Sequence, residues 1–128
     1  MRLILWTASV EIGTAHPFGL GLGGLEPALS QKLIAWGYPE QAKKEFNPHN
    51  QFLQIWNEIG YIGVLLFLGL LIFINQAFYN KRQLSGLLLS LVFIVFCLFE
   101  SILQRESGIV FFLCWFTALS YWPKNATT

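Results

Sequence analysis

The sequence predicts an all-α, polytopic membrane protein with about three transmembrane helices and an outer loop that contains short helices. Two observations lead to this fold class. Of the 128 residues, 55% are hydrophobic and only 12% are charged, whereas roughly 25% of the residues of a soluble domain are charged. The second half of the chain also contains long uncharged stretches, whose apolarity is continuous and lacks the period of an amphipathic helix or strand.

Residues 1–58 are predicted to form the outer loop. Residues 2–12 have the pattern of an amphipathic helix, which ends before the glycine-rich stretch GLGLGG. So many glycines interrupt a helix and allow the backbone to approach a ligand or another segment closely. The stretch PALSQKLIAW predicts a second short helix, with Pro27 in its first turn and Gly37 at its end.

Three apolar stretches within residues 59–122 are predicted to cross the membrane. The first, Ile59 to Phe78, is a run of 20 uncharged residues, which can span a hydrocarbon layer of about 30 Å at about 1.5 Å per residue. The second runs from Leu84 to Phe99, and the third runs from Gly108 to Trp122 and ends in aromatic residues that suit the headgroup region. Residues 123–128 then form a C-terminal tail.

The charges between the apolar stretches predict the orientation. Lys81 and Arg82 lie in the tight turn between the first two spans, and positive charge in a short loop favours the cytoplasmic side. Residues 1–58 and the connector 100–107 are therefore expected outside, on the face of the inner (cytoplasmic) membrane that is turned away from the cytoplasm, in a multi-pass protein. The net charge of +1 does not suggest a nucleic acid partner.

The stretch PHNQFLQIWNEIG contains the main candidate site. Asn47 is predicted to be the N-cap of a helix and Pro48 its first residue, so His49 would lie in the first turn. There the helix dipole would keep the imidazole neutral and able to accept a proton, and it would favour a bound phosphate. Alternatively, His49 and Asn50 only cap a helix and bind lipid headgroups, and the spacing alone favours this alternative.

Polar residues continue along the same predicted helix. Asn50, Gln54, Asn57 and Glu58 recur at helical spacing and form a polar stripe. Because lipid offers no hydrogen-bond partners, this stripe is expected to face protein or a wet cavity at the membrane surface.

A short charged turn separates the second and third apolar stretches. Glu100, Arg105 and Glu106 would each cost on the order of 3 kcal/mol at the centre of a bilayer, so they are expected at the outer interface, on the same side as His49. The turn is either solvated, with an internal Glu–Arg pair, or it helps to line a cavity beside His49.

The sequence has no pattern of metal ligands. It contains no Asp, its two histidines lie far apart, and both cysteines are in apolar stretches. None of these arrangements matches the spacing of a zinc or calcium site. We therefore expect neither a metal ion nor another cofactor.

Three stretches, RLILWTASVEIGTAHPFGLGLGGLEPAL, PHNQFLQIWNEIGYIGVLLFLGLL and FESILQRESGIVFF, together resemble the C-terminal part of the O-antigen ligase/polymerase family. The resemblance implies a membrane glycosyltransferase of the GT-C type that needs no metal. Such enzymes use a polyprenyl-diphosphate-linked glycan as donor on the periplasmic face. The acceptor hydroxyl belongs to a growing glycan, to a lipid A–core sugar or to a protein.

The resemblance also implies roles for individual residues. His49 matches the histidine of the family's functional loop, so it is expected to orient or deprotonate the acceptor hydroxyl. Arg2 resembles the arginine that opens the family's helical motif, and it is expected to bind the donor diphosphate. Asn50 and Glu58 match motif positions and are expected to shape the substrate site. Arg105 is expected to contact substrate for another reason, namely that the outer turn would line the cavity.

The chain departs from the family in its length, because family members normally have about ten or more spans, and spans need about 20 residues each. We therefore expect a C-terminal fragment that is inactive alone and that has the missing N-terminal half of the enzyme as its partner. Two other classes stay open from the residues, namely a small non-catalytic membrane subunit and a fragment of a transporter. A transporter fragment would be expected to contain charged residues or proline within its spans, and the predicted spans of this sequence contain neither.

Overall fold

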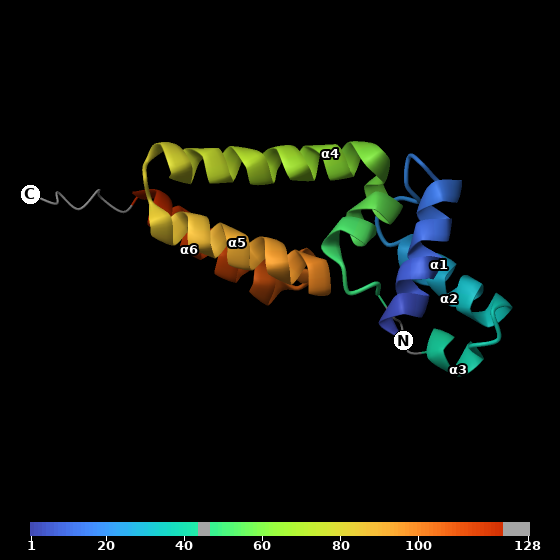
Figure 1. Cartoon of the computed structure of the whole chain (residues 1–128). Helices are drawn as coiled ribbons and strands as arrows, with labels where there is room; N and C mark the ends of the chain where they lie inside the picture. The colour runs from blue at the N-terminus through green and yellow to red at the C-terminus, as the bar shows by residue number, and fades with distance from the viewer. Residues whose placement is uncertain (44–46, 122–128) are drawn as a thin grey trace, which may run out of the picture.

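The computed structural model describes residues 1–43 and 47–121, and these residues form helices, turns and loops without a β-strand. The helices are α1 (Arg2–Ala15), α2 (Leu25–Ala35), α3 (Pro39–Ala42), α4 (Gln51–Asn80), α5 (Leu84–Phe99), the 3-10 helix η1 (Ile102–Gln104) and α6 (Glu106–Tyr121). The predicted all-α class is confirmed for this part of the chain. Helices α4, α5 and α6 form an elongated bundle, and α1 to α3 gather at one of its ends (Figure 1).

Aromatic and aliphatic side chains hold the bundle together. Phe67 and Leu71 of α4 are buried against Phe93 of α5, whose ring meets that of Phe112 of α6 edge-on at 4.4 Å between ring centroids. Because α4 and α5 are antiparallel, the turn between them lies at one end of the bundle, and the turn after α5 lies at the other end, beside α1 (Figure 1).

The outer surface of the bundle is apolar. Within the described residues, α4 is the one helix that is both long and apolar enough to cross a membrane, and only 22% of its most apolar 18-residue stretch is buried in the protein. A core helix of a soluble domain would be mostly buried. Helices α5 and α6 are apolar but have 16 residues each, so the three predicted spans are supported for α4 and stay a prediction for the other two.

Helix α4 is interrupted at Gly60. This residue has φ 79° and ψ −168°, a combination that is essentially restricted to glycine. The interruption divides α4 into a first part, residues 51–59, and a second part, residues 61–80, and the chain bends visibly between them (Figure 1). The first predicted span therefore begins beside a bend, and the division of the chain at residue 58 stays a prediction.

The glycine-rich loop after α1 packs directly against this bend. A helix break leaves backbone N–H and C=O groups without partners inside the helix. The glycine-rich loop provides the missing hydrogen-bond partners. Its hydrogen bonds run from Leu20 N–H to Asn57 O (2.8 Å), from Gly21 N–H to Glu58 O (2.9 Å) and from Tyr61 N–H to Pro17 O (3.1 Å). A Cβ on Gly19 would lie 2.5 Å from the Glu58 carbonyl oxygen. The glycines thus allow the close approach to another segment that the sequence predicted.

The two helices predicted in the first 40 residues are present. Helix α1 continues to Ala15, and α2 ends before Gly37, which has the positive φ of 83° that favours glycine after a helix. Apolar side chains of α1 and α2 pack against each other and are buried: Ala8, Ile12, Leu25 and Leu29. The predicted polar connector after α2 differs in one respect, because it includes the short helix α3.

Candidate functional site

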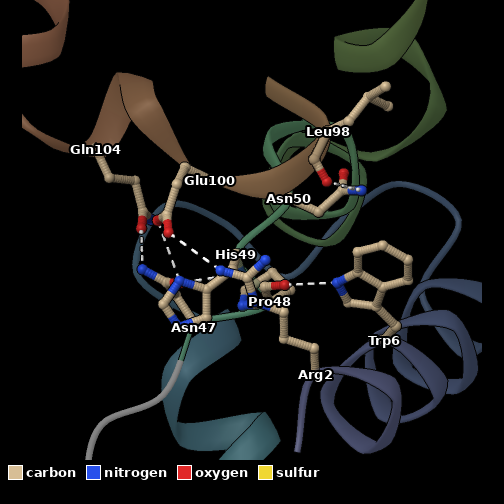
Figure 2. A network of polar contacts seen from close by, with 9 residues as sticks. All are labelled: Arg2, Trp6, Asn47, Pro48, His49, Asn50, Leu98, Glu100 and Gln104. Atoms are coloured by element: carbon tan, nitrogen blue, oxygen red, sulfur yellow. Dashed lines mark hydrogen bonds and ion pairs between the residues drawn. The ribbon is translucent and has the colours of Figure 1, made fainter. Parts of the chain in front are cut away.

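The two residues predicted to be catalytic meet at the end of the bundle that faces α1. His49 Nδ1 lies 3.1 Å from Glu100 Oε2, and Arg2 Nη2 lies 3.5 Å from Glu100 Oε1. Figure 2 shows that the imidazole and the guanidinium both face the carboxylate. A residue of α1 and a residue of the segment ahead of α4 thus converge on a carboxylate at the end of α5.

The predicted helix start at Asn47 is wrong. The N-cap of α4 is Asn50, whose Oδ1 accepts hydrogen bonds from the backbone N–H groups of Phe52 (3.0 Å) and Leu53 (3.1 Å). The Asn47 side chain instead accepts the His49 N–H at 2.9 Å, a local bond that competes with helix formation. His49 precedes the helix and has a left-handed φ of 47°.

The position of His49 ahead of the N-cap changes its electrostatic surroundings. A residue ahead of the N-cap does not lie in the first turn, where the helix dipole is strongest. The charged group that faces the ring is the Glu100 carboxylate, with Arg2 on the other oxygen of the same carboxylate. The protein therefore orients His49 with a neighbouring side chain.

The segment around His49 is held from both sides (Figure 2). Its contacts are Trp6 Nε1–H to Pro48 O (2.7 Å), Asn47 Nδ2–H to Gln104 Oε1 (3.5 Å), Asn50 Nδ2–H to Leu98 O (3.2 Å) and Leu103 N–H to Gln51 Oε1 (2.8 Å). Helix α1 and the turn between α5 and α6 therefore fix the backbone on either side of His49.

Replacing Asn50 with alanine should destabilise the protein by about 2 kcal/mol. The variant loses the cap on the N–H groups of Phe52 and Leu53, and it leaves the Leu98 carbonyl without the Asn50 donor. Thermal unfolding in detergent, followed by circular dichroism, measures the change. Asn80→Ala is the control, because Asn80 is exposed at the other end of α4. Equal melting temperatures for the two variants would contradict the predicted role of Asn50.

A groove adjoins the carboxylate. It has a volume of about 400 Å³ and lies beside the turn between α5 and α6. Its lining combines polar and apolar side chains: Phe96, Glu100, Ile102, Arg105, Ser107, Gly108, Phe111 and Phe112. The predicted site residue Arg105 therefore shares this groove with Glu100, while Glu106 is not part of the lining among the described residues. Of the two alternatives for this turn, the geometry favours the one in which it lines a cavity.

Glu58 lies apart from His49. Its Oε1 accepts hydrogen bonds from Gly23 N–H (3.1 Å) and from Gln54 Nε2–H (2.9 Å), so it ties the glycine-rich loop to α4. Gln54 and Asn57 are buried, with exposed fractions of 1% and 0%, and the polar stripe faces protein as predicted. Glu58 and Asn50 were both expected to shape a substrate site, and in the structure their hydrogen bonds are to protein groups.

Two contributors were missed by sequence reasoning. Glu100 was expected at the outer interface, on the side of His49, but not as the group that contacts both predicted catalytic residues. Trp6 lies within the predicted amphipathic helix of residues 2–12, for which no contact with the site was expected, and its indole N–H donates to the backbone next to His49. The spacing of Arg2 and Trp6 is a signal that could have found it, because residues four apart lie on one face of a helix.

The cluster of Arg2, His49 and Glu100 can perform proton transfer and bind an anion. The side chains are 52%, 28% and 37% exposed, respectively, so a solute can reach them. With Nδ1 on the carboxylate, the Nε2 atom of His49 is available to a substrate hydroxyl. No three His, Cys or carboxylate side chains in the described part of the chain lie close enough to hold a metal ion.

Comparison with known proteins gives a family match. Residues 1–68, more than half of the chain, match a family model described as O-antigen ligase. The matched segment contains Arg2, the glycine-rich loop, His49 and the first part of α4, and it ends before Glu100 and Arg105. Neither the curated proteins nor the solved structures give a match.

Proposed function

Because this chain belongs to the O-antigen ligase family, a membrane-associated group of glycosyltransferase-like ligases, we propose that it transfers a glycan from a polyprenyl-diphosphate donor to an acceptor hydroxyl. One observation carries the proposal: His49, from the segment ahead of α4, and Arg2, from α1, both lie within reach of the Glu100 carboxylate. A proton acceptor and a cation are thereby brought together, and this reaction requires both.

The proposed reaction assigns one task to each of these two residues. The acceptor oxygen attacks the anomeric carbon with inversion, and its proton passes to His49 Nε2. The bond between the anomeric carbon and the diphosphate oxygen breaks, and its electron pair leaves with the lipid diphosphate. Arg2, which is half exposed, stabilises the charge that develops on that leaving group.

The groove beside Glu100 suits the donor, which has a charged head and an apolar tail. Arg105 and Ser107 line its polar part and are placed to contact the diphosphate. Phe96, Phe111 and Phe112 line the remainder and offer apolar surface to the first units of the polyprenyl chain. This assignment retains Arg105 as a substrate-binding residue.

The proposed site faces the periplasm from the inner membrane. Helices α4, α5 and α6 then cross the membrane, and Lys81 and Arg82, at the other end of α4 and α5, face the cytoplasm, as positive charge in a short loop favours. The apolar surface of α4, of which little is buried, supports contact with lipid.

The proposed function predicts that Arg2→Ala lowers the kcat/KM for the lipid-linked donor by about 10²-fold. The variant removes the cation that meets the diphosphate, whereas Arg2→Lys keeps the charge but loses the planar fork and should fall in between. The measurement is the consumption of lipid-linked glycan by membranes from cells that express the protein from its natural gene.

Two comparisons make this experiment specific. Lys81→Ala is the control, because it removes a cation from the opposite end of the bundle, at the C-cap of α4, and it should leave transfer unchanged. Adding a candidate lipid A–core acceptor or protein acceptor separates ligation from glycan polymerisation. Unchanged transfer by Arg2→Ala would reject the assignment and favour a non-catalytic membrane subunit.

A further inference from the structure

We propose that Glu100 is a positioning residue, which holds the His49 ring in the orientation and tautomer needed to accept the proton of the acceptor hydroxyl. This inference rests on the proposed function. It starts from the contact of 3.1 Å between Glu100 Oε2 and His49 Nδ1. Glu100 directly follows the last residue of α5, and its extended backbone (φ −145°, ψ 148°) marks the end of that helix.

The contact determines the tautomer of His49. An ionised carboxylate only accepts hydrogen bonds, so the ring nitrogen that faces it must carry the proton. A neutral His49 therefore carries its proton on Nδ1 and its lone pair on Nε2. When Nε2 takes the proton of the acceptor hydroxyl, the imidazolium that forms lies beside the Glu100 carboxylate and is stabilised by it.

Among the groups described around His49, Glu100 is the one that can fix the orientation of the ring. The backbone on either side of His49 is fixed through Pro48 O and the Asn50 side chain, so the rotation of the ring is the freedom that remains. The charged groups near the carboxylate are Arg2 of α1, at 3.5 Å, and Arg105, which lines the same groove. Glu100 is therefore the acceptor placed to orient the ring.

The same carboxylate connects the base to the donor site. Arg2 contacts the other carboxylate oxygen of Glu100, and at 3.5 Å this contact is longer than that of His49. The Arg2 side chain is 52% exposed. A diphosphate that draws Arg2 away would leave the Glu100 charge facing His49 alone. Stabilisation of the imidazolium should then be greatest when the donor is bound, so proton transfer from the acceptor is coupled to donor binding.

Kinetics test the positioning role. Glu100→Gln keeps the size of the side chain and removes the charge, and we expect kcat for glycan transfer to fall by about 10²-fold. The KM for the donor should stay unchanged or fall, because Arg2 is no longer held by the carboxylate. Glu100→Asp restores a carboxylate one methylene shorter and should recover part of the lost rate. Glu106→Gln, an exposed residue at the start of α6, is the control and should keep full activity.

A spectroscopic measurement tests the tautomer without relying on activity. In the unaltered protein, ¹⁵N chemical shifts of the His49 ring should report a protonated Nδ1. In Glu100→Ala the proton should move to Nε2, because the acceptor at Nδ1 has been removed. The exposed ion pairs of Glu100 contribute little to stability, so both variants should keep the helical circular dichroism spectrum of the parent.

The outcomes separate this inference from the proposed function. Full transfer by a variant that lacks the His49 ring would reject the proposed function itself. Loss of transfer in that variant, together with full transfer in Glu100→Gln or an unchanged His49 tautomer in Glu100→Ala, would reject only the role of Glu100. Reduced kcat in Glu100→Gln with a shifted tautomer in Glu100→Ala would support it.

Discussion

Replacing His49 with asparagine should lower the rate of glycan transfer by about 10³-fold and leave the fold intact. The substitution removes the imidazole that is proposed to take the proton of the acceptor hydroxyl. Asparagine is the sharper choice than alanine, because His49 has a left-handed φ of 47° and asparagine tolerates that conformation better than most residues. The measurement is the turnover of lipid-linked glycan at saturating donor and acceptor.

The second histidine of the chain provides the matched control. His16 lies at the end of α1, and its Nδ1 is 3.1 Å from the Ile12 carbonyl oxygen. His16→Asn should leave transfer unchanged, because His16 is not part of the cluster around Glu100. Equal rates for the His49 and His16 variants would show that no imidazole takes part in the reaction.

Replacing Gly60 with alanine should have the largest effect on stability, a loss of about 3 kcal/mol or more. The φ of 79° and ψ of −168° at this residue exclude a side chain on conformational grounds. In addition, the new Cβ would lie 2.5 Å from the Pro17 carbonyl oxygen, so the glycine-rich loop would have to move away from α4. Thermal unfolding in detergent measures the loss.

The same substitution at Gly69 is the control. Gly69 lies in the second part of α4, and a Cβ there would meet no atom within 4 Å. Gly69→Ala should therefore leave the protein equally stable or stabilise it by up to about 1 kcal/mol, since alanine favours the helix.

Transfer activity should follow the same contrast, because the bend at Gly60 directs the first part of α4, with His49 ahead of it, toward α1. Gly60→Ala should lose transfer, and Gly69→Ala should keep it. A Gly60→Ala protein with the stability and the activity of Gly69→Ala would mean that the bend is not required.

The sequence by itself determined the main helices and the direction in which the polar stripe of α4 faces. Continuous apolarity predicted α4, α5 and α6, and glycine predicted the end of α2 at Gly37. The polar stripe through Gln54 and Asn57 was expected to face protein, and both residues are buried. Such features follow from properties that each segment carries by itself, namely its periodicity, its charge and the conformational freedom of its glycines.

Only the tertiary structure decided where α4 begins and which group His49 faces. Asn47 and Asn50 are equally good N-caps by residue type, and Asn50 takes that position while its amide also reaches the Leu98 carbonyl of α5. Likewise, the pairing of His49 and Arg2 with Glu100 joins residues that are 51 and 98 positions apart in the sequence. The energy of such contacts depends on the distances between segments that are remote in the sequence. Packing sets these distances, and they cannot be predicted from the local sequence of either segment.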